Sequence, residues 1–485
     1  MKEHVTTLLV NPPTPSMIKN KEYILPPALL YLGGYLKASG KEVEILDFNI
    51  YKPWEMDAEN PEKACFQTLI NKITEIKPSL IGFGCLFSGQ FSSVLEFAKI
   101  AKKHFPGIPI VVGGMHATLF AREILTHVPF IDYVILGEGE SQLLALVRYL
   151  NKEIQDIRDI PDGLAYRTDQ EIIIKPKQTY FQNLDTIPFP AYEHVNFDDY
   201  KHDTAHWHNP KGLQIGTPVP IISSRSCPCQ CNFCSMYLVG GSRFRHRTAE
   251  NVVAEMELLY EKYHVRHFSF MDDNLTFSKK RTIEICDQIL KRNLNVQFET
   301  LNGLYVRSLD QDVIDALVSA GWVRGALAIE SGSDYIRNII IKKNISKEKV
   351  YEIVGLIKKY PQVYVKAYFI IGMPEDTNET LMETYTMIND LNIDEPTITN
   401  VVPFPGTKLF DQCVRDRLFI DDVDLSTLWK DNSFYLTNNQ RFFLKPYKIE
   451  LEELKSYRTK LDQLLTDKQN LRKSKVKYYA CTDNK

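Results

Sequence analysis

The stretch SRSCPCQCNFCSMY, residues 224–237, holds four of the nine cysteines of the chain within eight residues. Three of them follow a C-x3-C-x2-C spacing, namely Cys227, Cys231 and Cys234. Cys229 stands outside this spacing. The apolar residues 221–222 precede the stretch and a helix pattern follows it, so we expect a loop after a buried strand. In a chain of this length, four crowded cysteines indicate a metal site rather than a disulfide framework.

Such a motif could form either of two kinds of metal site. Three thiolates can hold three irons of a cubane iron–sulfur cluster, which leaves the fourth iron open to a small molecule. An aromatic side chain at Phe233 can shield such a cluster from water. Zinc is the alternative, but four-cysteine zinc sites need a second pair of ligands at a distance, and the sequence has no second C-x2-C pair.

The composition is that of an ordinary globular protein. Of 485 residues, 44% are hydrophobic and 25% are charged, and the net charge is −3. This balance does not favour nucleic acid as a partner. No apolar run approaches the roughly 20 residues that span a bilayer. The start, MKEHVTTLLVNPPTP, indicates a first strand rather than a signal peptide, so we expect a cytoplasmic protein with reduced thiols.

Residues 1–150 alternate short apolar strands with amphipathic helices, which predicts a parallel sheet covered on both faces. The expected strands are 5–10, 43–46, 80–85, 108–112 and 133–136, and the expected helices are 28–39, 92–105 and 121–126. Glycines line the carboxyl edge of this expected sheet, at positions 82, 84, 113, 114 and 137. Ligands of such folds bind beyond the carboxyl ends of the strands, where these glycines allow the backbone to approach a large cofactor.

The rest of the chain predicts three further parts. Residues 151–216 have weak periodicity and read as a connector with some strand that covers part of the next domain. Residues 217–420 resume the βα repeat of a parallel barrel, complete or partial. Its expected strands lie near 267–271, 297–300, 325–329, 363–371 and 397–402. A helix is expected at 249–263, with Thr248 as its cap. Residues 421–485 form a helical region, with a helix at 447–465 and a frayed tail after it.

The C-x3-C-x2-C motif with an aromatic residue before its last cysteine resembles the radical S-adenosylmethionine superfamily. The resemblance implies a partial (β/α)6 TIM-type barrel in which Cys227, Cys231 and Cys234 ligate a [4Fe–4S] cluster. S-adenosylmethionine would chelate the open iron. Further matches imply contacts to S-adenosylmethionine at Asp272, Asp273, Glu330, Ser331 and Gly372. The alternative for the two aspartates is a helix cap at a βα turn, and the alternative for Glu330 and Ser331 is a simple turn.

The N-terminal α/β region resembles the Rossmann-like, doubly wound cobalamin-binding domain of cobalamin-dependent radical S-adenosylmethionine enzymes. The matching stretches are PPALLYLGGYL, SLIGFGCLFSG, IVVGGMHAT and DYVILGEGE. The cobalamin contacts that this implies are Gly84, Leu86, Phe87, Gly113, Gly114, His116, Gly137 and Glu138. The motif D-x-H-x-x-G, which supplies an axial histidine in other cobalamin proteins, is absent. We therefore expect His116 to face the nucleotide tail, the corrin amides or solvent.

The resemblance implies a methyltransferase that uses the cluster, S-adenosylmethionine and cobalamin on an unactivated carbon or a phosphorus of a small molecule. A low-potential donor such as flavodoxin or ferredoxin would supply electrons. Ring formation, rearrangement or oxygen insertion with the same cofactors is the alternative. A methylthiotransferase needs a second cluster, for which the N-terminal region has too few cysteines. A non-enzymatic electron carrier would not cleave S-adenosylmethionine. The sequence names neither substrate nor catalytic residue.

Overall fold

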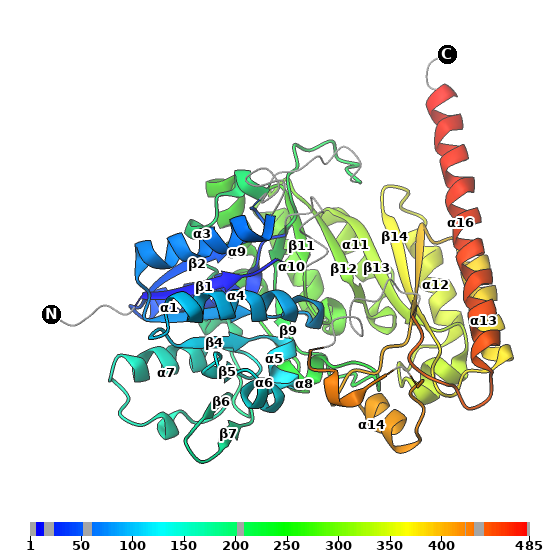
Figure 1. Cartoon of the computed structure of the whole chain (residues 1–485). Helices are drawn as coiled ribbons and strands as arrows, with labels where there is room; N and C mark the ends of the chain where they lie inside the picture. Colours follow the sequence, from blue (N-terminus) through cyan, green and yellow to red (C-terminus); the bar gives the residue numbers. More distant parts are fainter. Residues whose placement is uncertain are drawn as a thin grey trace.

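Two sheets, each covered by helices, stand side by side in the computed structural model of the chain (Figure 1). The N-terminal sheet is drawn in blue to cyan, and the second sheet in green to yellow. The structure describes residues 6–13, 24–51, 61–200, 208–421, 423–430 and 441–482. The α/β fold class with two successive domains, predicted from the sequence, is confirmed.

The first sheet has seven strands in the order β2-β1-β3-β4-β5-β6-β7. Their bounds are β1 Thr6–Asn11, β2 Glu42–Asp47, β3 Leu80–Gly84, β4 Ile110–Gly113, β5 Tyr133–Ile135, β6 Leu164–Arg167 and β7 Ile172–Lys175. Strands β1 to β5 pair in parallel, in the 2-1-3-4-5 order of a doubly wound sheet. All five lie close to the predicted positions, because continuous apolar runs mark strands that are buried on both faces.

The expected connector differs from the structure in one respect. Strands β6 and β7 lie within it, yet they extend the first sheet rather than cover the barrel. β6 pairs antiparallel with β5, with Leu164 opposite Ile135, and β7 pairs antiparallel with β6. The buried side chains of Leu164 and Tyr166 join the core on one face of this sheet. Their short, weakly periodic sequence gave no indication of which sheet they would join.

Among the described residues, the helices that accompany the first sheet are α1 Pro27–Ala38, α3 Pro61–Ile76, α4 Phe91–His104, α5 Met115–Leu119, α6 Ala121–His127 and α7 Glu140–Leu150. Helix α4 buries Val94, Phe97, Ala98 and Ala101, the face that its 3.6-residue period predicts. Helices α3 and α7 were not predicted, although α7 buries its own apolar face against the sheet.

The second sheet has six strands in the order β15-β14-β13-β12-β11-β8, all of them parallel. Their bounds are β8 Val219–Ile221, β11 His267–Phe270, β12 Gln297–Leu304, β13 Trp322–Glu330, β14 Tyr364–Ile371 and β15 Glu395–Asn400. β8 and β15 form its two edges, so the sheet is a partial barrel of the predicted (β/α)6 type. Because the strands are parallel, the loops that follow them gather at one end of the barrel.

The helices of this domain are α8 Met236–Gly240, α9 Ala249–Tyr263, α10 Lys279–Lys291, α11 Gln311–Ala320, α12 Lys347–Ile357, α13 Asn378–Asp390 and α14 Lys408–Arg415. Helix α9 begins where the sequence predicts, because the Thr248 side chain accepts a hydrogen bond from the Asn251 N–H. A pair of two-residue strands, β9 Ser224–Arg225 and β10 Arg245–His246, brackets the cysteine stretch.

The C-terminal helix α16 runs from Leu451 to Thr482, so the predicted end at residue 465 and the frayed tail after it are wrong. Residues 466–482 contain neither glycine nor proline, and nothing in their sequence stops a helix. The buried side chains of Leu454 and Leu461 anchor α16 to the barrel core. None of the helices that the structure describes is both long and apolar enough for a bilayer span.

Gly114 directly follows β4 with a φ of +107°, and a Cβ built on it would lie 2.4 Å from the Cys85 carbonyl oxygen. We expect Gly114→Ala to lower the free energy of unfolding of the apoprotein by about 2 kcal/mol or more, since backbone strain adds to a backbone clash. Urea unfolding followed by circular dichroism measures this. Gly107→Ala is the control, because a Cβ there meets nothing within 4 Å; an equal loss in both variants would contradict the argument.

Candidate functional site

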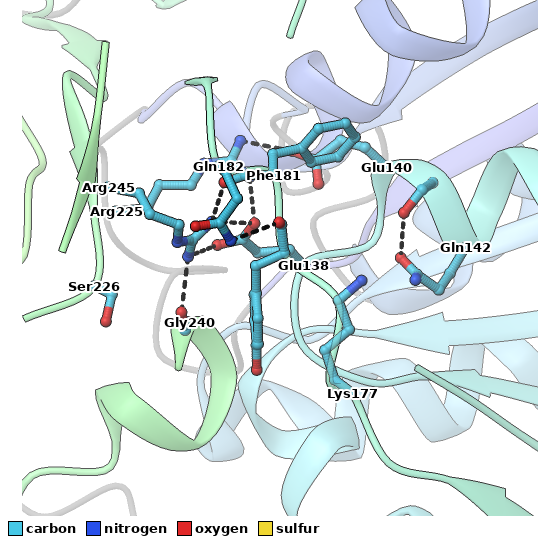
Figure 2. Close-up of polar contacts among 12 residues, drawn as sticks. Glu138, Glu140, Gln142, Lys177, Phe181, Gln182, Arg225, Ser226, Gly240 and Arg245 are labelled. Atoms are coloured by element: carbon cyan, nitrogen blue, oxygen red, sulfur yellow. Dashed lines mark hydrogen bonds and ion pairs between the residues drawn. The ribbon is translucent and has the colours of Figure 1, made fainter. Parts of the chain in front are cut away.

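The turn after β5 contacts the loops that follow β8, which brings the carboxyl edges of the two sheets face to face. Glu138 and Glu140 come from this turn, and Arg225 and Arg245 come from β9 and β10 of the barrel domain (Figure 2). Arg225 forms ion pairs with both carboxylates, and Arg245 pairs with Glu138. We call these four residues the Glu–Arg cluster. These ion pairs therefore join the two sheet edges that are predicted to hold cofactors.

The cysteine loop leaves β9 with two residues in the left-handed region, Ser226 at a φ of +71° and Gln230 at +46°. A turn then closes, in which the Cys234 N–H donates to the Cys231 carbonyl at 3.1 Å. The Cys231 side chain is buried, while Cys227 and Cys234 are half-buried. The backbone thus folds the three motif cysteines into one compact loop, as expected for a segment without regular structure.

The surroundings of the loop lower the pKa of one motif cysteine and raise that of the other two. The Asn274 amide Nδ2 donates to Cys227 Sγ at 3.5 Å and lies 3.9 Å from Cys229 Sγ. A hydrogen bond from Cys229 lowers the pKa of Cys227 to about 6. Burial raises the pKa of Cys234 to about 12 and also raises that of Cys231. The three cysteine sulfurs of the motif suit iron, because thiolates are the usual protein ligands of iron in clusters.

Within the described residues, no three Cys, His, Asp or Glu side chains are grouped so that they could hold a metal ion. The assignment of Cys227, Cys231 and Cys234 as cluster ligands therefore rests on their spacing and shared loop. It remains a prediction for these individual residues.

Asp272 and Asp273 follow β11 and hold the strand and loop that lead into the cysteines. Asp272 is 3% exposed and accepts hydrogen bonds from the hydroxyls of Ser223, at 2.7 Å, and Ser224. Asp273 accepts the Ser226 N–H at 2.9 Å. Burial raises the pKa of both carboxyls, that of Asp273 to about 6. Their predicted contact with S-adenosylmethionine stays a prediction beside this structural role.

Glu330 and Ser331 end β13 within a tight polar network. Glu330 Oε1 lies 2.7 Å from Lys343 Nζ, and both side chains are buried. Burial by itself lowers the pKa of Lys343, but the charge and hydrogen bond of Glu330 and the charges of Cys231 and Cys229 together outweigh burial, so the net pKa is raised. The Ser331 hydroxyl accepts the Ser333 N–H at 3.1 Å. Lys343 therefore places a fixed positive charge close to the cysteine loop, since Cys231 also acts on its pKa.

Gly372 follows β14 with a φ of +85°, and its N–H donates to Asp376 Oδ2 at 2.8 Å. This left-handed turn requires a residue without a Cβ. Its carbonyl and those of its neighbours remain candidates for contact with S-adenosylmethionine.

The carboxyl edge of the first sheet exposes apolar side chains that suit a macrocycle. Leu86 is 51% exposed and Phe87 is 66% exposed, directly after β3. Gly84 and Gly113 pair across β3 and β4 just before this edge. Exposed large apolar neighbours of this kind commonly mark a binding surface. The edge therefore fits cobalamin, with Leu86 and Phe87 as its predicted neighbours.

His116 departs from expectation. Its side chain is 1% exposed, so the alternative of a solvent-facing ring is wrong. The ring packs between Phe91 and Phe120, with centroid distances of 4.2 Å and 4.9 Å, and burial lowers its pKa to about 3. The His116 side chain, near the start of helix α5, lies in the domain core, where neighbouring aromatic rings enclose it. A cobalamin contact for His116 stays a prediction.

Sequence reasoning missed four residues of this site: Asn274, Lys343, Arg225 and Arg245. Asn274 stood next to the predicted aspartates, so its position in the same turn was an available signal. Arg225 stood two residues before Cys227, but the sequence did not show which charge it would meet. Lys343 and Arg245 gave no local signal, because only the tertiary structure brings them into this network.

A hollow of about 440 Å³ opens beside the cysteine loop at the mouth of the barrel. Its lining comes from the loop itself and from the turns after β11 and β12: Pro228, Cys229, Phe277, Tyr305, Arg307 and Ser308. The lining combines aromatic surface with one exposed guanidinium. Such a hollow can take a small molecule that has an apolar part and a polar or anionic group.

Two known protein families match this chain, one over each of its two domains. Residues 16–147 match the B12 binding domain family, and residues 221–388 match the Radical SAM superfamily.

Individual relatives extend this agreement along the chain. An uncharacterized methyltransferase of Pyrococcus horikoshii is 30% identical over 415 residues, which cover 85% of this chain and 84% of that protein. An anaerobic magnesium-protoporphyrin IX monomethyl ester cyclase of Rubrivivax gelatinosus is 28% identical over 402 residues, which cover 82% of this chain and 68% of that protein.

A solved structure shares the fold. The radical S-adenosylmethionine methyltransferase TsrM from Kitasatospora setae, with cobalamin and a [4Fe–4S] cluster bound, superposes with a TM-score of 0.69 at 18% identity. The alignment covers 85% of this chain and 78% of that chain.

The chain is therefore a radical S-adenosylmethionine enzyme with an N-terminal B12-binding domain. It belongs to the family that includes the Pyrococcus protein. The family resemblance predicted from the sequence is confirmed. The cofactors of the two matched domains are those predicted, a [4Fe–4S] cluster, S-adenosylmethionine and cobalamin.

We expect single replacement of Cys227, Cys231 or Cys234 by Ala to abolish the cluster in anaerobically reconstituted protein. The intact protein should bind ~4 irons and absorb broadly near ~400 nm. Iron analysis and the absorption spectrum measure this. Cys229→Ala is the matched control and should keep the iron, because Cys229 lies outside the motif spacing. Equal iron loss in that variant would show that the ligand triplet is wrongly assigned.

Bound cobalamin should have no protein nitrogen on its cobalt. The axial histidine motif is absent, and the His116 ring is buried between Phe91 and Phe120. Electron paramagnetic resonance of the Co(II) state should therefore show no splitting from an axial nitrogen. A nitrogen splitting that disappears in His116→Gln would overturn this expectation.

Proposed function

We propose that the chain is a cobalamin-dependent radical S-adenosylmethionine methyltransferase that methylates an unactivated carbon or a phosphorus of a small molecule. The observation that carries the proposal is the Glu–Arg cluster, which joins the carboxyl edges of the two sheets. A methyl carrier on the first edge and a radical source at the cysteine loop would then face one substrate. When bound, the cluster with S-adenosylmethionine supplies a 5′-deoxyadenosyl radical and cobalamin supplies the methyl group.

The residues of the chain then have separate tasks. Leu86 and Phe87 would cover the face of the corrin and keep water from it. The hollow beside Cys229 would hold the substrate, with Arg307 to orient a polar or anionic group and Phe277 to contact its apolar part. Enclosing the reacting groups protects a radical from side reactions. A low-potential protein such as flavodoxin or ferredoxin would deliver the electrons.

Similarity to methyltransferases supports methyl transfer as the outcome. Similarity of the same extent to a ring-forming cyclase favours a second candidate, in which the same cofactors close a ring without transferring a methyl group.

Product stoichiometry separates the two. Methyl transfer consumes two molecules of S-adenosylmethionine per product: one loses its methyl group and leaves S-adenosylhomocysteine, and the other is cleaved with one electron to methionine and 5′-deoxyadenosine, which carries the substrate hydrogen. With substrate and a low-potential reductant, both nucleosides should accumulate at about one per product. Label from the S-methyl group should enter the product. Liquid chromatography with mass spectrometry measures all three.

Cys231→Ala is the control and should form no 5′-deoxyadenosine. Turnover that yields 5′-deoxyadenosine without matching S-adenosylhomocysteine, and without label in the product, would refute methyl transfer and favour ring formation or rearrangement.

A further inference from the structure

The cysteine loop begins after β9 and ends before β10, and these two short strands close its base. They pair antiparallel, with Arg225 directly opposite Arg245. The arginine side chains are only 14% and 2% exposed. Like charges directly across a ladder destabilise strand pairing, and burial increases the cost because water no longer screens them. The pairing of β9 with β10 therefore requires negative charge from another part of the protein.

The cobalamin-binding domain supplies that charge (Figure 2). Glu138 Oε2 lies 3.2 Å from Arg225 Nη1 and accepts a hydrogen bond from Arg245 Nη1 at 2.9 Å. Its other oxygen accepts a hydrogen bond from Arg245 Nη2. Glu140 Oε1 accepts one from Arg225 Nη2 at 2.6 Å. Two carboxylates thus balance two guanidiniums, and Glu138 alone contacts both arginines.

These two arginines connect both ends of the cysteine loop to Glu138 by ion pairs. Arg225 stands two residues before Cys227, at the entry to the loop. At its exit, Arg245 Nη2 donates to the carbonyl of Gly240, the last residue of α8, at 2.7 Å. Between the ends, the Ser226 hydroxyl donates to the Gly241 carbonyl. The Glu138 carboxylate therefore ties the entry and the exit together.

The turn that carries Glu138 also packs directly on the loop. A Cβ built on Gly137 would lie 2.9 Å from the Val239 carbonyl oxygen. The aromatic rings of Tyr31 and Tyr180 cover the guanidiniums of Arg225 and Arg245, 5.5 Å and 4.9 Å from their centroids. The carboxylate is thus held beside its partners and is only 9% exposed to solvent.

We propose that Glu138 is a positioning residue that closes the base of the cysteine loop from the cobalamin-binding domain. It neutralises two opposed arginines, so the loop keeps the shape that ligates the cluster only while the turn after β5 holds its place. The role differs from the predicted contact with cobalamin, since both carboxylate oxygens face arginines. It also does not depend on whether the enzyme transfers a methyl group.

Hydrogen exchange of the full-length apoprotein tests the proposal. Glu138→Gln keeps the shape of the side chain but removes the charge, which leaves two buried arginines with one carboxylate. We expect backbone amides of residues 226–241 to exchange about tenfold faster or more, because an uncompensated buried charge strongly destabilises its surroundings. Strands β3 and β14, in the two domain cores, should keep their protection. After reconstitution, the variant should lose iron to a chelator faster than the unchanged protein.

Two further variants complete the test. Glu193→Gln removes the same charge from an exposed ion pair with Lys37 and should change neither readout. Glu138→Gln combined with Arg245→Met removes one of the opposed charges, so it should exchange more slowly at 226–241 than Glu138→Gln alone, even if the single variant folds poorly. Unchanged loop exchange in Glu138→Gln, an equal rise in β3 and β14, or no recovery in the double variant would overturn the proposal.

Discussion

A carboxylate between two opposed arginines is the contact on which the arrangement of this enzyme depends. Glu138 comes from a turn of the first sheet, while Arg225 and Arg245 come from the two strands that bracket the cysteines. Buried charges are tolerated when they are paired and hydrogen-bonded, and here the pairing crosses between domains. The same contact therefore folds the cysteine loop and brings the two sheet edges together.

This arrangement explains why two cofactor sites from separate domains can serve one reaction. Each site lies at the carboxyl edge of a parallel sheet, where loops rather than strands determine chemistry. Leu86 and Phe87 form the exposed apolar part of one edge, and the hollow beside Cys229 opens at the other. We propose that a small substrate binds between these two edges.

Several carboxylates near the cysteines already have partners within the protein. Asp272 binds serine hydroxyls, Asp273 binds a backbone N–H next to the first cysteine, and Glu330 binds Lys343. Burial accounts for this, because an unpaired buried carboxylate is costly. These residues shape the loops at the barrel mouth, whatever further contacts they make with S-adenosylmethionine.

The sequence alone determined the fold class, most strands and helix α9, because apolar periods and the Thr248 cap act over a few residues. It also determined the cysteine motif, because three ligands within one short loop need no distant partner. Only the tertiary structure decided the rest. It assigned β6 and β7 to the first sheet, buried His116 between aromatic rings and paired Glu138 with arginines about 90 and 110 residues away in the sequence. Pairing and burial between distant segments depend on how the domains pack, which no local pattern encodes.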